Sequence, residues 1–219
     1  MHRPRGDRRT TGATSLGGPN EATAESRSGV RRCYNRASKG DSQSRSDKEN
    51  HGMKVLFVCL GNVFRSPVAE AFYNRLTHDH DATSAGVEAS AHQLDGRLVV
   101  EECMVTIQLM REVGIDISEK RSRQLTPAMV DGADLVVYLA DRDHLPDYLA
   151  KSEKLRRWPT KDLVDGPDPT RLPPMARHDL WTARCNADGI GPANYRFAVG
   201  IRGQIGQRVE ELLEEEGRQ

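Results

Sequence analysis

Hydrophobic and polar positions follow regular patterns from Met53 onward, where short apolar runs alternate with longer stretches of helical periodicity. Continuous apolar runs are typical of strands buried in a parallel sheet. Two such runs predict strands over residues 54–59 and 134–139, and further strands are expected over 82–86, before a Gly-containing turn, and over 155–158. Helical spacing predicts helices from Ser66 with Pro67 in its first turn, over 98–113 with Gly114 as its end, from Thr126, over 142–150 and over 194–216. Strands that alternate with helices indicate an α/β fold, here a single three-layer α/β/α domain with a central four-stranded parallel sheet.

Residues 1–52 have a different character, because Arg, Ser, Gly and Asn dominate there and aliphatic side chains are scarce. Such a segment cannot bury enough apolar area to offset the entropy lost on ordering it. We therefore expect a disordered tail over 1–52, or a start placed too early, since Met53 directly opens the first strand. A basic, Ser-rich docking or modification segment is the alternative. The predicted domain occupies residues 53–217.

The composition narrows the possible function classes. The 219 residues contain 32 Lys and Arg against 32 Asp and Glu, so no bulk positive field points to nucleic acid. No apolar run has the length that crosses a membrane. The four cysteines form no CxxC pair, which argues against a zinc site and against a disulfide scaffold. We therefore expect a reduced, cytoplasmic protein that uses neither a metal nor an organic cofactor.

The most informative motif is Cys59-x5-Arg65-Ser66, which follows a predicted buried strand and precedes a predicted helix start. A helix N-terminus and a nearby arginine favour the thiolate form of cysteine, which is the nucleophile. The backbone N–H groups of such a loop can point inward at one anion, and Gly61 permits close approach. Arg65 can hold two phosphate oxygens in a bidentate fork. The motif predicts a nucleophile, Cys59, and a phosphate-binding loop formed by Leu60, Gly61, Asn62, Val63, Phe64, Arg65 and Ser66.

Two polar side chains are expected to support this loop. Ser66 can cap the helix and donate a hydrogen bond to the Cys59 thiolate. Asn62 tolerates a left-handed backbone and can tie the loop to its surroundings.

The chain resembles the low-molecular-weight protein-tyrosine phosphatases, a family that also contains the thioredoxin-coupled arsenate reductases. The resemblance spans residues 53–217 and is carried, in family order, by VCLGNVFRSPVAEAFYNRL, TSAGVEAS, GIDISEKRSRQL, ADLVVYLADRDHL and GPDP. It implies a phospho-cysteine intermediate on Cys59 and a phosphoryl group bound by Arg65. It also implies that Ser84 supports the loop and that Asp168, which precedes Pro169, is the general acid.

Phosphate ester hydrolysis needs such an acid, because the leaving oxygen departs more easily when it is protonated. Residues 159–192 are rich in Pro, Asp and Gly and predict a long loop, a setting that is often functional. Asp165 in the same loop is the alternative acid. Either aspartate could instead simply form a turn. The Asp-Pro context favours Asp168.

Departures from the family pattern change what is expected of the loop. The family often has a second cysteine where this chain has Phe64, so Cys59 should form no disulfide within the loop. Lys120 stands where a histidine commonly supports the loop asparagine. Lys120 could take over that support, or it could be an exposed charge.

The substrate side of the predicted site also departs from the pattern. Tyrosine-specific members have aromatic residues after the Asp-Pro pair, where this chain has Thr170 and Arg171. Trp158, Trp181 and Tyr195 are candidate replacements, although each could instead pack in the core. Val63 is aliphatic, as in the tyrosine-directed enzymes.

We interpret the protein as a cysteine-dependent phosphatase for phosphomonoesters, with phosphotyrosine in proteins as the favoured substrate. The expected partner is a phosphorylated protein or a small phosphomonoester. An arsenate reductase is one alternative, but it needs a close pair of resolving thiols or a small external thiol. Cys103 and Cys185 lie far apart in sequence, and Cys103 falls on a helical apolar face. A non-catalytic module that binds phosphate or a phosphoprotein is the other alternative.

Overall fold

The computed structural model describes residues 52–78, 80–141, 145–166, 185–186 and 192–217. The chain divides into two units, residues 1–47 and 48–219, and the first lies wholly outside the described residues. The predicted tail therefore stays a prediction. No described helix combines the length and the apolar character that crossing a membrane requires.

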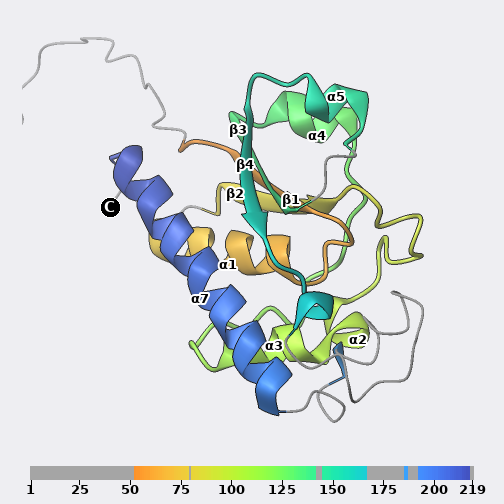
Figure 1. The fold of residues 1–219 in the computed structure, drawn as a ribbon. Helices are drawn as coiled ribbons and strands as arrows, with labels where there is room; N and C mark the ends of the chain where they lie inside the picture. The colour runs from red at the N-terminus through yellow and green to blue at the C-terminus, as the bar shows by residue number, and fades with distance from the viewer. Residues whose placement is uncertain (1–51, 79, 142–144, 167–184, 187–191, 218–219) are drawn as a thin grey trace, which may run out of the picture. The chain divides into compact units, whose positions relative to one another are not determined.

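Four strands form one parallel sheet in the order β2-β1-β3-β4 (Figure 1). Their bounds are Val55–Cys59 for β1, Ala82–Gly86 for β2, Leu135–Ala140 for β3 and Leu155–Thr160 for β4. Every residue of β1 is buried, as expected for an unbroken apolar strand whose two faces are both covered. The predicted four-stranded parallel sheet is confirmed, although β4 continues two residues further than the apolar run predicted.

Helices cover both faces of the sheet, which gives the predicted three layers. They are α1 (Arg65–Thr77), α2 (Val99–Glu102), α3 (Met104–Arg111), α4 (Pro127–Gly132), α5 (Asp147–Ala150), the 3-10 turn η1 (Leu163–Asp165) and α7 (Pro192–Glu215). Successive residues of a strand point to opposite faces. Phe57 accordingly packs into the core with α1, α3 and α7, whereas Leu56 and Val58 pack with α4 and α5. Figure 1 shows α1 beside α7, and α4 beside α5.

The single helix predicted over 98–113 is wrong at Cys103, whose backbone (φ −150°, ψ 83°) separates α2 from α3. Hydrophobic periodicity could not detect this break. Cys103 is fully buried, so the apolar pattern of the helix continues through it. The cause is tertiary. Leu98 pairs with Arg121, which sets the direction of α2. Thr106, which follows the break, donates to the carbonyl of Val63 and so sets the direction of α3.

Three helix starts also differ from the prediction. Helix α1 begins at Arg65 with Phe64 as its cap residue and no side-chain cap, so Ser66 is not a cap. Helix α5 begins only at Asp147, after a proline whose backbone is extended, and residues 142–144 lie outside the described part. Helix α7 begins at Pro192, where a proline needs no hydrogen-bond partner for its nitrogen.

Candidate active site

Cys59 ends β1, a central strand, at the carboxyl edge of the sheet where open α/β folds bind ligands. Its Sγ accepts a hydrogen bond from the backbone N–H of Asn62 at 3.3 Å and another from Oγ of Ser66 at 3.0 Å. Both donors can stabilise negative charge on the sulfur. The structure thus brings together the nucleophile candidate and two residues of what we call the 59–66 loop.

Asn62 ties this loop to two other parts of the chain, at Ser84 and Arg123, and braces it internally at Ser66. Its backbone has φ 58°, the left-handed conformation that asparagine tolerates. Its Nδ2 donates to Oγ of Ser66 at 2.9 Å and to Oγ of Ser84 at 2.8 Å. Its Oδ1 accepts from the backbone N–H of Arg123 at 2.8 Å. Asn62 is completely buried with all its side-chain hydrogen-bonding atoms engaged, so it holds the loop in one shape.

Two hydroxyl groups that sequence reasoning missed hold carbonyls of the same loop. Ser122 donates to the carbonyl of Gly61 at 2.8 Å, and Thr106 donates to the carbonyl of Val63 at 2.9 Å. With these carbonyls tied from outside, the loop keeps one backbone shape around Cys59. Neither hydroxyl lies in a recognisable motif with Cys59, so only the fold reveals the contacts.

Gly86 is a third residue that the sequence analysis missed. A Cβ at this position would lie 2.4 Å from the carbonyl oxygen of Leu60 and 2.8 Å from the backbone nitrogen of Asn62. We had assigned the need for close backbone approach to Gly61, where a Cβ would instead meet the flexible side chain of Leu94 at 2.9 Å. A glycine at the end of a strand was the available signal for close approach of another backbone segment.

Arg65 is held from the opposite side by the turn that follows β4. Its Nη2 donates to Oδ2 of Asp162 at 2.8 Å, and its Nη1 donates to the carbonyl of Thr160 at 3.1 Å. Both charged side chains are about 90% buried or more. Asp162 is a fourth missed residue, and its position just after a predicted strand was the only sign in the sequence. Because a guanidinium carries five N–H donors, Arg65 keeps donors for an anion while it stays paired.

The two predicted acid candidates have different places in the structure. Asp165 is exposed, and its Oδ2 accepts from the backbone N–H of Asp162 at 2.8 Å in a capping box that opens η1. Oδ1 of Asp162 accepts from the backbone N–H of Leu163. Asp168 lies outside the described residues, so its assignment stays a prediction.

A family model described as low molecular weight phosphotyrosine protein phosphatase matches residues 54–171, which include the whole 59–66 loop and the Asp162 turn. The chain belongs to this family. A protein of Ralstonia solanacearum named probable low molecular weight protein-tyrosine-phosphatase EpsP is 33% identical over 57% of this chain and 83% of its own length. An arsenate reductase of Bacillus licheniformis is 29% identical over 73% of this chain and 94% of its own.

Solved structures of the same family divide in the same way. A low molecular weight protein tyrosine phosphatase from T. tengcongensis superposes with a TM-score of 0.51 at 25% identity, covering 74% of this chain and 99% of that one. An arsenate reductase in the phosphate-binding state also gives a TM-score of 0.51, at 28% identity, covering 74% and 98%. Membership of the phosphatase family therefore supports a cysteine phosphatase or an arsenate reductase of the same fold.

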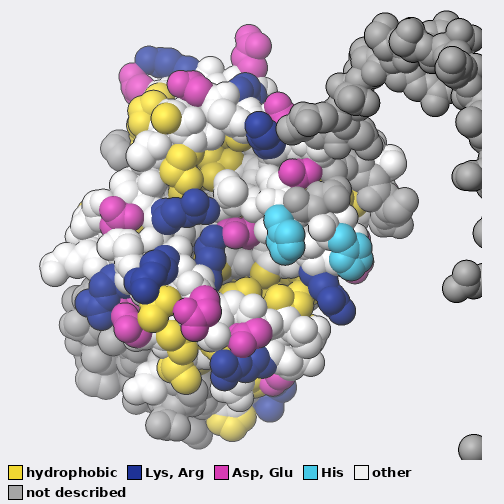
Figure 2. All heavy atoms as spheres, turned by 180° about the vertical axis from the view of Figure 1, so that it is seen from behind, with side chains coloured by type: hydrophobic (Ala, Val, Ile, Leu, Met, Phe, Trp, Pro, Cys, Tyr) yellow, Lys and Arg dark blue, Asp and Glu magenta, His cyan; other side chains and the backbone are white. Residues whose placement is uncertain are grey.

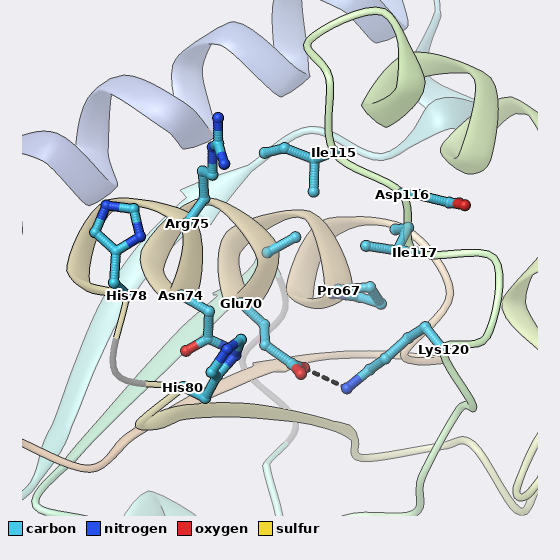
Figure 3. A pocket seen from close by; sticks show the side chains of 11 residues that line it. Pro67, Glu70, Asn74, Arg75, His78, His80, Ile115, Asp116, Ile117 and Lys120 are labelled. Atoms are coloured by element: carbon cyan, nitrogen blue, oxygen red, sulfur yellow. Dashed lines mark hydrogen bonds and ion pairs between the residues drawn. The ribbon is translucent and has the colours of Figure 1, made fainter. Parts of the chain in front are cut away.

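Lys120, which replaces the histidine common in this phosphatase family, neither supports the loop asparagine nor stands exposed. Its Nζ donates to the carboxylate of Glu70 on α1 (Figure 3). The two side chains line a pocket of about 390 Å³ beside that helix. Burial lowers the pKa of Lys120, although Glu70 opposes the effect. The backbone of Arg123 contacts Asn62 instead, so the asparagine is held without the family's histidine.

Two of the aromatic candidates for contact with the substrate, Trp158 and Tyr195, have different surroundings. Trp158 is 9% exposed, and its ring packs 6.0 Å from that of Phe57 in the core. Tyr195 donates to the carboxylate of Glu112 at the end of α3. Burial and this carboxylate raise the pKa of Tyr195 to about 12. Trp181 and the Thr170–Arg171 pair lie outside the described residues.

Cys103 is buried in the core, as predicted, but it is not isolated. Cys185, far from it in sequence, is buried in the same hydrophobic cluster. Among the described residues, no three His, Cys, Asp or Glu side chains converge as metal ligands. The face drawn in Figure 2 carries intermixed basic and acidic side chains rather than a field of one sign.

Proposed function

We propose that the protein is a cysteine-dependent phosphatase that hydrolyses phosphomonoesters, with phosphotyrosine in proteins as its substrate class. One observation carries the proposal: the Cys59 sulfur accepts hydrogen bonds from Asn62 N–H and from the Ser66 hydroxyl within a loop that Arg65 closes. The matched family and the Ralstonia relative, both named as phosphatases, support it. The aliphatic side chain of Val63 favours phosphotyrosine within this substrate class.

The proposed reaction has two displacements at phosphorus. The Cys59 thiolate attacks phosphorus, the bond to the leaving oxygen breaks, and Asp168 donates a proton to that oxygen. Asp168 then takes a proton from water, whose oxygen attacks phosphorus and releases phosphate and the Cys59 thiolate. Arg65 and the backbone N–H groups of the 59–66 loop hold the other phosphoryl oxygens.

The contacts of the neighbouring carboxylates favour Asp168 as the acid. Asp162 is paired with the buried guanidinium of Arg65 through one carboxylate oxygen and accepts from the backbone N–H of Leu163 through the other. Asp165 is engaged with the N–H that opens η1. We therefore assign proton transfer to Asp168 and a positioning role to Asp162.

Turnover of para-nitrophenyl phosphate by the parent protein and three variants tests both assignments. We expect no turnover by Cys59→Ser, and a loss on the order of 100-fold or more by Asp168→Asn. The matched control is Asp165→Asn, which should retain near-parent turnover. A parent protein that binds inorganic phosphate without turnover would favour a binding module and overturn the enzyme proposal. Equal turnover by Asp168→Asn would overturn only the acid assignment.

Arsenate reduction is the second candidate, because relatives and a solved structure of the same fold carry that name. Cys103 and Cys185, which lie in one buried cluster, give it a further argument, since such enzymes need a second thiol pair. Arsenate-dependent loss of free thiols, without turnover of para-nitrophenyl phosphate, would favour the reductase. Phosphatase turnover with arsenate acting only as a competitive inhibitor would favour the hydrolase.

We also propose that residues 53–217 form the whole catalytic domain and that it works in a reducing compartment such as the cytoplasm. The three cysteines of the described residues are all free, which fits such a compartment. Removal of residues 1–52 should leave turnover unchanged, and a loss of activity would show that the tail takes part.

A further inference from the structure

The segment 120–124 lies beside the 59–66 loop and holds it at two points. The hydroxyl of Ser122 donates to the carbonyl of Gly61 at 2.8 Å, and the backbone N–H of Arg123 donates to Oδ1 of Asn62 at 2.8 Å. Both acceptors belong to the part of the loop that follows the nucleophile directly. The shape of the loop therefore depends on where Ser122 and Arg123 are held.

Lys120 begins this segment, and its side chain is bonded to helix α1. Its Nζ donates to the carboxylate of Glu70 at the cavity that Figure 3 shows beside the helix. Glu70 follows Arg65, the first residue of α1, at a distance of about 7.5 Å along the helix. The ion pair thus joins the helix that carries Arg65 to the segment that holds Gly61 and Asn62.

The ion pair is largely withdrawn from water. The side chains of Lys120 and Glu70 are each 16% exposed, against 76% and 87% for the pair of Lys151 and Asp147 at α5. Partly buried charges are screened less by water and salt than exposed ones. Removal of one partner also leaves the other charge uncompensated. A change at Lys120 or Glu70 should therefore be felt by the elements that these residues join.

We propose that the ion pair of Lys120 and Glu70 positions the phosphate-binding loop, because it fixes the 120–124 segment against α1. Its effect passes along the backbone from Lys120 to Ser122 and Arg123, and from their hydrogen bonds to the loop that carries Cys59. This inference deepens the proposed phosphatase activity and rests on it for its catalytic readout. The effect on the loop itself can be measured without turnover.

Hydrogen–deuterium exchange of the full chain tests the positioning independently of catalysis. Lys120→Met removes the charge and keeps an unbranched side chain. We expect backbone N–H groups over residues 60–66 and 121–125 to exchange about fivefold faster or more than in the parent, with those of β3 unchanged. Lys120→Arg should restore parent exchange, because a guanidinium can still donate to Glu70. Lys151→Met, which removes the exposed ion pair, is the matched control.

The pH profile of turnover gives a readout that a general loss of stability would not reproduce. Burial lowers the pKa of Lys120, Glu70 opposes this effect and Arg123 adds to it. The ion pair is therefore complete below this pKa and is lost as the pH rises through it, at lower pH than for an exposed lysine. The parent should lose turnover in this alkaline range, whereas Lys120→Arg should keep it, because a guanidinium stays charged. The other charged or titratable side chains around the cavity are Arg75, His78, His80 and Asp116.

Turnover of para-nitrophenyl phosphate at neutral pH completes the test. Lys120→Met and Glu70→Gln should each lower kcat per folded molecule on the order of tenfold, with circular dichroism giving the folded fraction. Lys120→Arg and Lys151→Met should keep the parent kcat.

The inference is overturned if residues 60–66 of Lys120→Met exchange as in the parent, or if this variant keeps the parent kcat. A parent without turnover, in which Lys120→Met still accelerates exchange of the loop, would overturn the proposed phosphatase and leave the positioning role standing.

Discussion

Cys59 and Cys103 are both buried thiols, and their different surroundings assign them different chemistry. The Cys59 sulfur accepts from a backbone N–H and a serine hydroxyl, in a loop that also carries the guanidinium of Arg65. Cys103 lies among apolar side chains of the core, in the cluster that also holds Cys185. A thiolate beside a guanidinium is suited to attack a bound anion, whereas a cysteine enclosed by the core serves packing. Burial by itself does not decide the reactivity of a cysteine, because the groups around the sulfur decide it.

Replacement of Asp162 should have the largest effect, because its charge pairs with Arg65 and also acts on Cys103. Asp162→Asn leaves the buried Arg65 without its anion, which should cost about 3 kcal/mol of unfolding free energy. Misplacement of Arg65 should lower turnover by on the order of 100-fold. The charge of Asp162 raises the pKa of Cys103, so its removal should also let Cys103 be alkylated at lower pH.

Urea unfolding, turnover of para-nitrophenyl phosphate and the pH profile of Cys103 alkylation measure these three effects. Asp165→Asn is the matched control, since Asp165 is exposed in the same turn. If Asp162→Asn unfolds with the same free energy as the parent, the ion pair with Arg65 does not stabilise the fold.

Gly86→Ala should disturb the 59–66 loop and leave Cys103 unchanged. The new Cβ would lie 2.4 Å from the carbonyl oxygen of Leu60, so the backbone must shift. We expect a loss of about 2 kcal/mol in unfolding free energy, with turnover reduced about tenfold or more as Cys59 and Arg65 move. Gly203→Ala is the control, because a Cβ there meets nothing and the helix should gain roughly 0.5–1 kcal/mol. Retained turnover by Gly86→Ala would show that the loop tolerates the shift.

Thr106→Val should affect both cysteines, since Thr106 contacts the 59–66 loop and also acts on Cys103. Its hydroxyl donates to the carbonyl of Val63 at 2.9 Å and also favours the Cys103 thiolate. A hydroxyl has a single proton to donate, so the two acceptors compete for it. The valine variant should lose about 1 kcal/mol of stability, reduce turnover a few-fold, and raise the pH at which Cys103 is alkylated. Thr106→Ser keeps the hydroxyl and should restore both readouts; a serine variant as impaired as valine would point to packing instead.

The smallest expected effect lies outside both regions, at Tyr195. Burial and the carboxylate of Glu112 raise its pKa from 10.0 to about 12 in the folded protein. Since the folded value is above the unfolded one, the stabilisation is complete below about pH 10 and is lost as the pH rises through about 12. Tyr195→Phe should remove this loss from a plot of unfolding free energy against pH, without changing turnover. A parent plot that is already flat between these pH values would contradict the prediction.

Much of the fold followed from local patterns. Unbroken apolar runs located β1 and β3, because a strand buried on both faces needs apolar side chains at every position. Helix boundaries were less accurate. The break at Cys103 is caused by contacts of Leu98 with Arg121 and of Thr106 with the 59–66 loop, which join residues far apart in sequence. Periodicity reports which side of a helix is buried and does not report such contacts.

Local sequence patterns were enough to predict the sheet, the 59–66 loop and the spacing of Cys59 and Arg65, because a strand, a tight loop and a helix in succession are local features. The surroundings of these elements became visible only in the folded chain. There Asp162 pairs with Arg65, and Gly86 lies against the backbone of the loop. These partners come from other strands and helices, and side-chain pairing in a folded core depends on how the elements pack rather than on the order of residues in the chain.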